Sequence, residues 1–298
     1  MSGLDSEDPE VIDFAAAGPR GSAARQVRGR LLIAGVVAAV IAVAAAVVLA
    51  GIRPGSAPAA GHGDPALARL VAQVTGVPVR VSDAAGAGTG GLLLSKPVPV
   101  TGPPLTARGK PEVLYIGSEY CPYCATQTWA MIVALSRFGT FTGLRTIRSA
   151  SYQSYPPLDT WTFYGSAFTS RYLTFVPVET RSNVKTAGGG YARLQRLTAA
   201  QQALLSRYGY QNSVPFLDFG NRFVMNGSSF APFVLERQTW SQVAAELGRP
   251  RSPVGATILG DANYITAALC RLTGGQPARA CTPVVGSLPG PWAPMTAR

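Results

Sequence analysis

The sequence predicts an α/β fold in which a βαβ unit is followed by a β-hairpin and a helix, with one transmembrane helix before the folded domain. Three observations lead to this prediction. Residues 31–52 are uncharged and almost wholly apolar. Residues 112–118 form an apolar run of buried-strand length, followed directly by a helical pattern. The dipeptide Gly220-Asn221, which favours a two-residue hairpin turn, joins two further apolar runs within residues 214–227.

The apolar segment Leu31–Ile52 is long enough to cross a membrane. Its 22 residues, at a helical rise of about 1.5 Å each, span a hydrocarbon core of about 30 Å. A cleaved signal peptide is the alternative, but the apolar region of such a peptide runs over only about 7 to 15 residues. Arginines cluster in residues 20–30, and only Arg53 follows the segment closely. This bias predicts a single-pass protein of the cell membrane with a cytoplasmic N-terminus and an extracytoplasmic C-terminal domain.

Composition divides the rest of the chain. Residues 1–30 carry early acids and few large apolar groups, which predicts a disordered cytoplasmic tail. Residues 53–64 form a linker of Pro, Gly and Ala. We expect the folded extracytoplasmic domain over residues 65–285, with an aromatic-rich insertion at about 152–212. Residues 286–298 are then a flexible tail.

The charge of the chain does not by itself identify a partner. A net charge of +11 allows nucleic-acid binding, but the basic residues are scattered singly and are not interleaved with aromatic residues in runs. Attraction to an anionic envelope surface fits the same charge. We therefore expect the membrane, and no nucleic acid, among the partners.

Local patterns predict the elements of the domain. The strand at 112–118, the helix at 122–138 and a strand at 143–151 together predict the βαβ unit. Two further helices begin with capping boxes, in which a threonine is followed three residues later by a glutamine. Alternating apolar residues predict a strand at 77–82. The remaining helices are predicted at 65–76, 198–209, 239–248 and 258–275.

The four cysteines lie beyond the membrane segment, in the compartment predicted to be oxidising, where disulfides form. Four cysteines allow three pairings, and closeness in the sequence favours Cys121 with Cys124 and Cys270 with Cys281. The second pair flanks a Gly/Pro loop outside any strand-to-helix context. We predict a structural disulfide there, which stabilises the fold by about 3 kcal/mol.

The first pair has the position of a reactive dithiol. Cys121 begins the predicted helix, and Pro122 occupies its first position, where a missing N–H costs nothing. Free N–H groups at a helix start stabilise a thiolate, so Cys121 is the predicted nucleophile. Cys124 lies one turn further, on the inward stripe of an amphipathic helix, and is the predicted resolving thiol. A purely structural Cys121–Cys124 bridge is the alternative.

A metal site is not expected. Structural zinc takes four nitrogen or sulfur ligands, and the single histidine, His62, lies in the predicted linker. A site of four cysteines would need a spacing that the second pair lacks, and a copper carrier would need histidine. The sequence therefore predicts no metal and no cofactor.

These motifs give the chain a resemblance to a known superfamily. With the strand at 112–118, the helix that opens with CPYC, and the segment SVPFLDF at a hairpin, the chain resembles the thioredoxin-like superfamily. The segments IGSEYCPYCA, YLTFVPVET and VPFLDFGNRFVMNG are similar to those of the domain-of-unknown-function family 929, over about residues 64–281. The resemblance implies that Pro215 is cis and faces the dithiol, and that Val214 offers its backbone to a bound substrate strand.

The chain also departs from the superfamily. The buried aspartate of thioredoxin, six positions before the first cysteine, is replaced here by Tyr115. The nearest acid, Glu119, is either a solvated loop residue or a proton shuttle. The dipeptide Pro-Tyr between the cysteines is that of glutaredoxins, but no glutathione-binding pattern accompanies it. Tyr120 and Tyr123 flank the thiols, either as packing aromatics or as an apolar lip for a substrate chain.

Together these features predict a membrane-anchored extracytoplasmic thiol–disulfide oxidoreductase with a thioredoxin-like fold. Its substrates would be protein thiols and disulfides, and a redox protein of the membrane is a candidate partner. Oxidase, isomerase and reductase share this framework. The alternative is a redox-inactive thioredoxin-like binding module of the cell envelope, in which the aromatic-rich residues 152–191 hold a partner.

Overall fold

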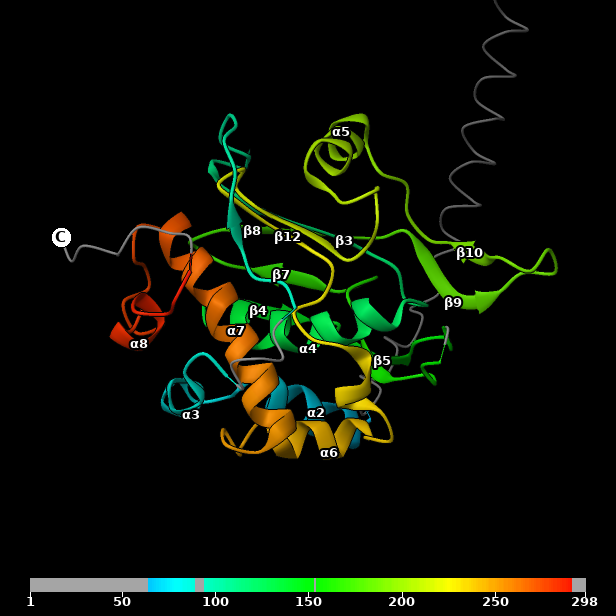
Figure 1. Ribbon diagram of the computed structural model, residues 1–298, viewed down its shortest axis with the longest axis horizontal. Helices are drawn as coiled ribbons and strands as arrows, with labels where there is room; N and C mark the ends of the chain where they lie inside the picture. Colours follow the sequence, from blue (N-terminus) through cyan, green and yellow to red (C-terminus); the bar gives the residue numbers. More distant parts are fainter. Residues whose placement is uncertain (1–63, 89–93, 153, 291–298) are drawn as a thin grey trace, which may run out of the picture. The chain divides into compact units, whose positions relative to one another are not determined.

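The computed structural model describes residues 64–88, 94–152 and 154–290 (Figure 1). The predicted cytoplasmic tail, the membrane segment 31–52 and most of the linker lie outside the described residues. Within the part of the chain that is described, no helix is both long and apolar enough to span a bilayer.

The central sheet is mixed, and strand β3 (Lys110–Gly117) runs through it as the predicted buried strand. Strand β8 (Thr174–Glu179) lies parallel to β3, and β11 (Phe216–Phe219) lies antiparallel along the opposite edge of β3. Strand β12 (Phe223–Asn226) continues the sheet beyond β11. Two short strands complete the sheet: β1 (Val98–Pro99), which pairs with β12, and β2 (Thr106–Ala107), which pairs with the start of β3.

The predicted βαβ unit has a different second strand. The segment 143–151 does contain a strand, β5 (Arg145–Arg148), but it pairs antiparallel with β6 (Asp159–Thr162) in a separate two-stranded sheet. The prediction that it lies beside β3 is therefore wrong. The parallel partner of β3 is β8, within the predicted insertion 152–212. A parallel strand is buried on both faces, and β5 ends on two exposed arginines, whereas β8 is mostly apolar.

Two further pairs of short strands extend from this region. Strand β4 (Thr140–Thr142) pairs with β7 (Ala167–Thr169), and β9 (Arg181–Lys185) pairs with β10 (Tyr191–Arg193). Strand β9 follows β8 after a single residue, so the β9–β10 hairpin begins where the central sheet ends.

Helices cover both faces of the central sheet. In Figure 1, α5 (Ala199–Tyr208) lies above the sheet, and α4 (Pro122–Ser136) and α7 (Pro253–Leu272) lie below it. The other helices, all short, are α2 (Pro65–Thr75), α3 (Val79–Ala85), the 3₁₀ turn η1 (Pro232–Leu235), α6 (Trp240–Glu246) and α8 (Pro283–Gly286). Both predicted capping boxes are present, at the starts of α5 and α6.

The side chains of the sheet alternate between two hydrophobic cores. Tyr115 and Phe175 belong to the larger core, which includes α4 and α7. Ile116 and Val178 belong to the smaller core, which includes α5. The burial of α4 differs from the prediction, because every residue except Tyr123 and Ser136 is buried. A helix packed on all sides has no polar stripe, so the amphipathic pattern predicted for it is wrong.

The strand predicted at residues 77–82 is also wrong, because residues 79–82 belong to helix α3. The amide of Asn263, on α7, donates hydrogen bonds to the backbone oxygens of Ser82 and Gly86. These contacts satisfy carbonyl groups at the end of the helix. Alternation of valines is a weak local preference, and packing against α7 overrides it.

The hairpin between β11 and β12 has one more connecting residue than predicted. Gly220 and Asn221 both have positive φ, 65° and 58°, as a primed turn requires. Phe219 pairs with Phe223, so the connection also includes Arg222. The carboxylate of Asp218 accepts a hydrogen bond from the backbone N–H of Asn221 at 2.6 Å, which holds the turn.

Candidate functional site

Cys121 and Cys124 lie at the N-terminus of α4, where the sequence places them. Cys121 is the N-cap residue, and its Sγ accepts a hydrogen bond from the backbone N–H of Cys124 at 3.3 Å. Pro122 follows at the first helical position. Both cysteines are free thiols, and Cys121 is 7% exposed whereas Cys124 is 2% exposed. The outer and inner positions predicted for the two thiols are therefore present in the fold.

The surroundings shift the pKa values of the two thiols in opposite directions. A hydrogen bond from the Cys124 side chain lowers the pKa of Cys121, and the backbone N–H groups of Cys124 and Tyr123 act the same way against the cost of burial. Burial raises the pKa of Cys124 well above its ordinary value, and the hydrogen bond and charge of Cys121 add to that effect. The arrangement favours a thiolate on Cys121 and a proton on Cys124.

The loop before β11 meets the outer thiol. The backbone oxygen of Val214 lies 3.9 Å from the Sγ of Cys121. The Val214–Pro215 peptide bond is cis, as the resemblance implies. The structure thus brings together residues that are about 90 positions apart in the sequence.

Tyrosines surround the thiols. Tyr120 stacks on Tyr191 of β10, with ring centroids 4.3 Å apart and planes within 3°. Tyr123 meets the edge of Tyr155 at 5.8 Å, and a hydrogen bond that the Tyr123 hydroxyl donates to Tyr155 raises the pKa of Tyr123 to about 12. Both flanking tyrosines are partly buried. The aromatic-rich segment therefore lies beside the dithiol, which its sequence alone did not reveal.

A buried acid that the sequence analysis missed also lies at this site. Glu179 ends β8 and is only 2% exposed. Its carboxylate accepts a hydrogen bond from the backbone N–H of Phe163, but Oε2 has no partner among the described residues. Burial, with the charge of Glu119, raises the pKa of Glu179 to about 8. The sequence did contain a signal for Glu179, which is an acid at the carboxyl end of an apolar strand. It was missed because the strand at 143–151, and not β8, was predicted to lie beside β3.

Glu119 is neither fully buried nor freely solvated. It is partly buried, and its Oε1 accepts a hydrogen bond from Thr162 Oγ1 at 2.7 Å. Its backbone N–H donates to the backbone oxygen of Arg181 at 2.9 Å. The loop between β3 and α4 is therefore fastened to β6 and β9.

Tyr115, on β3, is fully buried. Its hydroxyl lies over Gly117, where a Cβ would overlap the Tyr115 Oη. This hydroxyl donates a hydrogen bond to the Cys124 side chain. Burial raises the pKa of Tyr115 well above its ordinary value, and the charges of Cys124 and Glu179 add to the shift. Gly117 therefore provides the space in which the tyrosine hydroxyl ends.

Replacement of Gly117 with alanine is expected to destabilise the domain by about 1 to 3 kcal/mol, because the new methyl group overpacks a buried ring. Denaturant unfolding measures the loss. The matched control is Gly190→Ala on the β9–β10 hairpin, where a Cβ has nothing within 4 Å. Equal stability of the two variants would contradict the placement of Tyr115.

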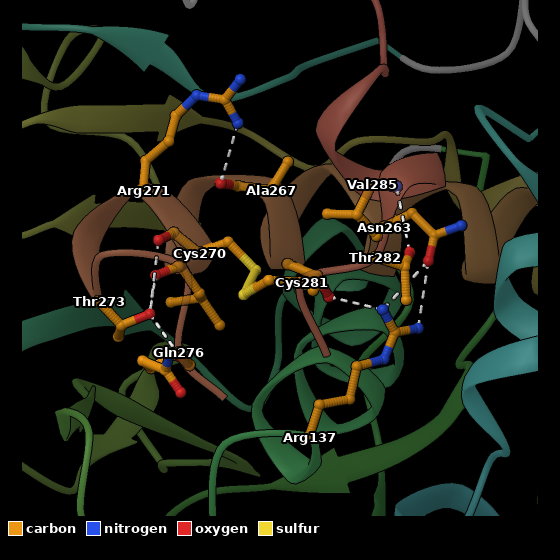
Figure 2. The surroundings of a disulfide bond; sticks show 12 residues. Arg137, Asn263, Ala267, Cys270, Arg271, Thr273, Gln276, Cys281, Thr282 and Val285 are labelled. Atoms are coloured by element: carbon orange, nitrogen blue, oxygen red, sulfur yellow. Dashed lines mark hydrogen bonds between the residues drawn. A yellow bond between two sulfur atoms is a disulfide. The ribbon is translucent and has the colours of Figure 1, made fainter. Parts of the chain in front are cut away.

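The second cysteine pair forms a disulfide between Cys270 and Cys281 (Figure 2). This is the pairing that the sequence favours. Cys270 lies near the end of α7 and is fully buried. Arg137, just after α4, lies near this disulfide in Figure 2. Because α4 has 15 residues, the disulfide and Cys121 lie near opposite ends of a helix about 20 Å long.

Among the described residues, no three or more His, Cys, Asp or Glu side chains are grouped to hold a metal ion. Fold and site together define a mixed α/β domain with a Cys-Pro-Tyr-Cys dithiol at the start of a buried helix. Residues 96–271, more than half of the chain, match the family model described as Domain of unknown function (DUF929). The chain belongs to this family. No curated protein and no solved structure matches the chain.

Proposed function

We propose that this protein is a membrane-anchored extracytoplasmic thiol–disulfide oxidoreductase that acts on protein thiols and disulfides through Cys121 and Cys124. One observation carries the proposal: at a single helix start, one thiol pKa is lowered and its neighbour's is raised. A purely structural disulfide does not require different pKa values for its two thiols. A nucleophile and a resolving thiol need it.

The topology supports a thioredoxin-like fold. The helix with the dithiol follows the inner strand β3, which has a parallel neighbour, β8, on one edge and the antiparallel β11–β12 hairpin on the other. This is the order that the sequence resemblance implies, once β8 replaces β5 as the second strand.

The proposed reaction moves two electrons between a pair of thiols and a disulfide. The Cys121 thiolate attacks one sulfur of a substrate disulfide and forms a mixed disulfide, while the other substrate sulfur leaves as a thiolate. Cys124 then loses its proton and attacks Cys121 Sγ. The Cys121–Cys124 disulfide forms, the mixed disulfide breaks, and the substrate leaves reduced. The same steps in reverse oxidise a substrate dithiol.

The substrate of this reaction is a protein segment in an extended conformation. The backbone of Val214 lies 3.9 Å from the Cys121 sulfur, in position to pair with a chain that presents its own sulfur to Cys121. Tyr120 and Tyr123 provide the apolar contacts beside it. In this proposal Val214, Pro215 and the two tyrosines bind the substrate.

Two features support the proposed location of the domain. The apolar segment 31–52 anchors the chain, and its flanking arginines place the N-terminus in the cytoplasm. The Cys270–Cys281 disulfide supports an oxidising compartment for the folded domain.

A Cys124→Ala variant is expected to accumulate mixed disulfides on Cys121, because the second thiol can no longer release the substrate. Non-reducing electrophoresis of membranes from cells that express the variant should show adducts that disappear on reduction. The Cys121→Ala/Cys124→Ala variant is the matched control and should show none.

Absence of adducts on the single variant contradicts a catalytic dithiol. Measurement of the reduction potential of the wild-type pair adds an independent criterion. A potential below about −300 mV resists exchange and supports the binding module with a structural bridge instead.

A further inference from the structure

We infer that Glu179 is the proton partner of Cys124, taking the thiol proton when Cys124 attacks the mixed disulfide and returning it when the Cys121–Cys124 disulfide is reduced. The inference rests on the proposed function, and it assigns a role to a residue that neither the motif nor the family identifies.

The sheet register places Glu179 at the dithiol. Glu179 pairs with Gly117, the last residue of β3, and the CPYC helix begins a few residues beyond. Side chains alternate along β8, and Phe175 faces the core that includes α4. Glu179, four residues further, points to that same side. Gly117 has no side chain, and the hydroxyl of Tyr115 occupies the space beside it.

Three buried polar groups act on one another near the start of α4. The Oε2 of Glu179 is buried without a hydrogen-bond partner among the described residues, and the buried hydroxyl of Tyr115 bonds to the Cys124 side chain. The third group is the buried thiol of Cys124, and the charge of Glu179 acts on both it and Tyr115. Unpartnered buried polar atoms cost stability, and proteins retain them mainly where they function.

The groups that face Glu179 also provide a way out for the proton. From α4 and its N-cap come the two thiols, from β3 comes Tyr115, and from the loop before α4 comes Glu119. Glu119 is partly exposed and is held by Thr162. Its charge acts on Glu179. In this inference Glu119 passes the proton between Glu179 and solvent.

The chemistry needs such a partner. Burial holds the proton on Cys124, yet only the thiolate attacks a disulfide. In the resolving step the proton passes from Cys124 to the Glu179 carboxylate, the Cys124 sulfur bonds to Cys121, and the substrate thiolate leaves. The two electrons come from the protein dithiol and reduce the substrate disulfide. A carboxyl group that titrates near pH 8 can exchange this proton at physiological pH.

Single-turnover kinetics with dithiobis(nitrobenzoate) test the inference on the reduced full-length chain in detergent. Attack by Cys121 releases one coloured thiolate, and resolution by Cys124 releases a second, so each step has its own phase. The Glu179→Gln variant is expected to keep the first phase and to slow the second on the order of 100-fold at pH 7. The matched control is Asp218→Asn, a buried carboxyl that also has one unpartnered oxygen.

The pH profile separates proton transfer from a structural effect. In the wild type the second phase should rise with pH and level off above about pH 8. In Glu179→Gln it should instead follow the hydroxide concentration without levelling. If this variant does not fold, the pH profile of the wild type alone tests the inference. A wild-type second phase whose rate rises in proportion to the hydroxide concentration up to pH 10 overturns the inference.

Other outcomes are equally decisive. An unchanged second phase in Glu179→Gln, or equal slowing in Asp218→Asn, overturns the role of Glu179 and leaves the proposed function standing. A wild-type protein that releases no second thiolate forms no Cys121–Cys124 disulfide. That result removes the proposed function itself, and the inference with it.

Discussion

Replacement of Glu179 with glutamine is expected to flatten the pH dependence of stability between about pH 5 and pH 8. The pKa of Glu179 rises from 4.5 to about 8 on folding, chiefly through burial. Below pH 4.5 the carboxyl group is protonated in both states. As the pH increases, the unfolded chain ionises first, so stability falls until the folded state ionises near pH 8. By linkage this loss amounts to roughly 4 to 5 kcal/mol.

Denaturant unfolding of the reduced protein at pH 5 and pH 8 measures this effect. Between pH 5 and pH 8 the free energy of unfolding of the wild type should fall by several kcal/mol more than that of Glu179→Gln. Asp218 also has a raised pKa, of about 6, so Asp218→Asn should affect only the lower part of the range. An equal pH slope for wild type and Glu179→Gln contradicts the burial of an ionisable carboxyl beside the thiols.

Removal of the Cys270–Cys281 disulfide is the second change with a large expected effect. The bond closes a loop with a sequence separation of 11 residues, and its loss should lower the free energy of unfolding by about 3 kcal/mol. For a domain of this size the melting temperature should fall by roughly 6 to 12 °C. Calorimetry of a Cys270→Ala/Cys281→Ala variant measures the change.

The same variant should leave the reactivity of Cys121 unchanged, because the disulfide lies near the far end of α4. The rate of alkylation of Cys121 is the control measurement. A variant that melts like the wild type but cannot be re-oxidised or re-reduced by its partner would show that the second pair is an electron relay. The structural role assigned to that pair would then be wrong.

Features that depend on a few neighbouring residues were predictable from the sequence. The start of α4 at Pro122, with Cys121 as its cap, follows from the local preferences of proline and cysteine. The capping boxes of α5 and α6 follow from a threonine and a glutamine three residues apart. The closeness of Cys270 to Cys281 in the chain likewise favoured the pairing that the structure contains.

Features that depend on long-range packing were not predictable in the same way. Residues 145–148 and 174–179 both have strand patterns, and only the need for a strand buried on both faces selects β8 as the neighbour of β3. Residues 79–85 are helical, and Asn263 of α7 bonds the carbonyl oxygens of Ser82 and Gly86. In both segments tertiary contacts outweighed a local preference.

In the candidate site, too, some features depend on neighbouring residues and others on tertiary contacts. The sequence by itself determined the dithiol, the order of its two thiols along the helix and the turn residues of the hairpin, because bonds within a few residues govern them. Only the tertiary structure brought the charge of Glu179 to act on Cys124, placed Val214 beside Cys121, and placed Tyr155 and Tyr191 on the flanking tyrosines. These contacts join elements far apart in the chain, and they depend on which strands are neighbours in the sheet. That choice is made by the burial of whole faces and not by any local signal.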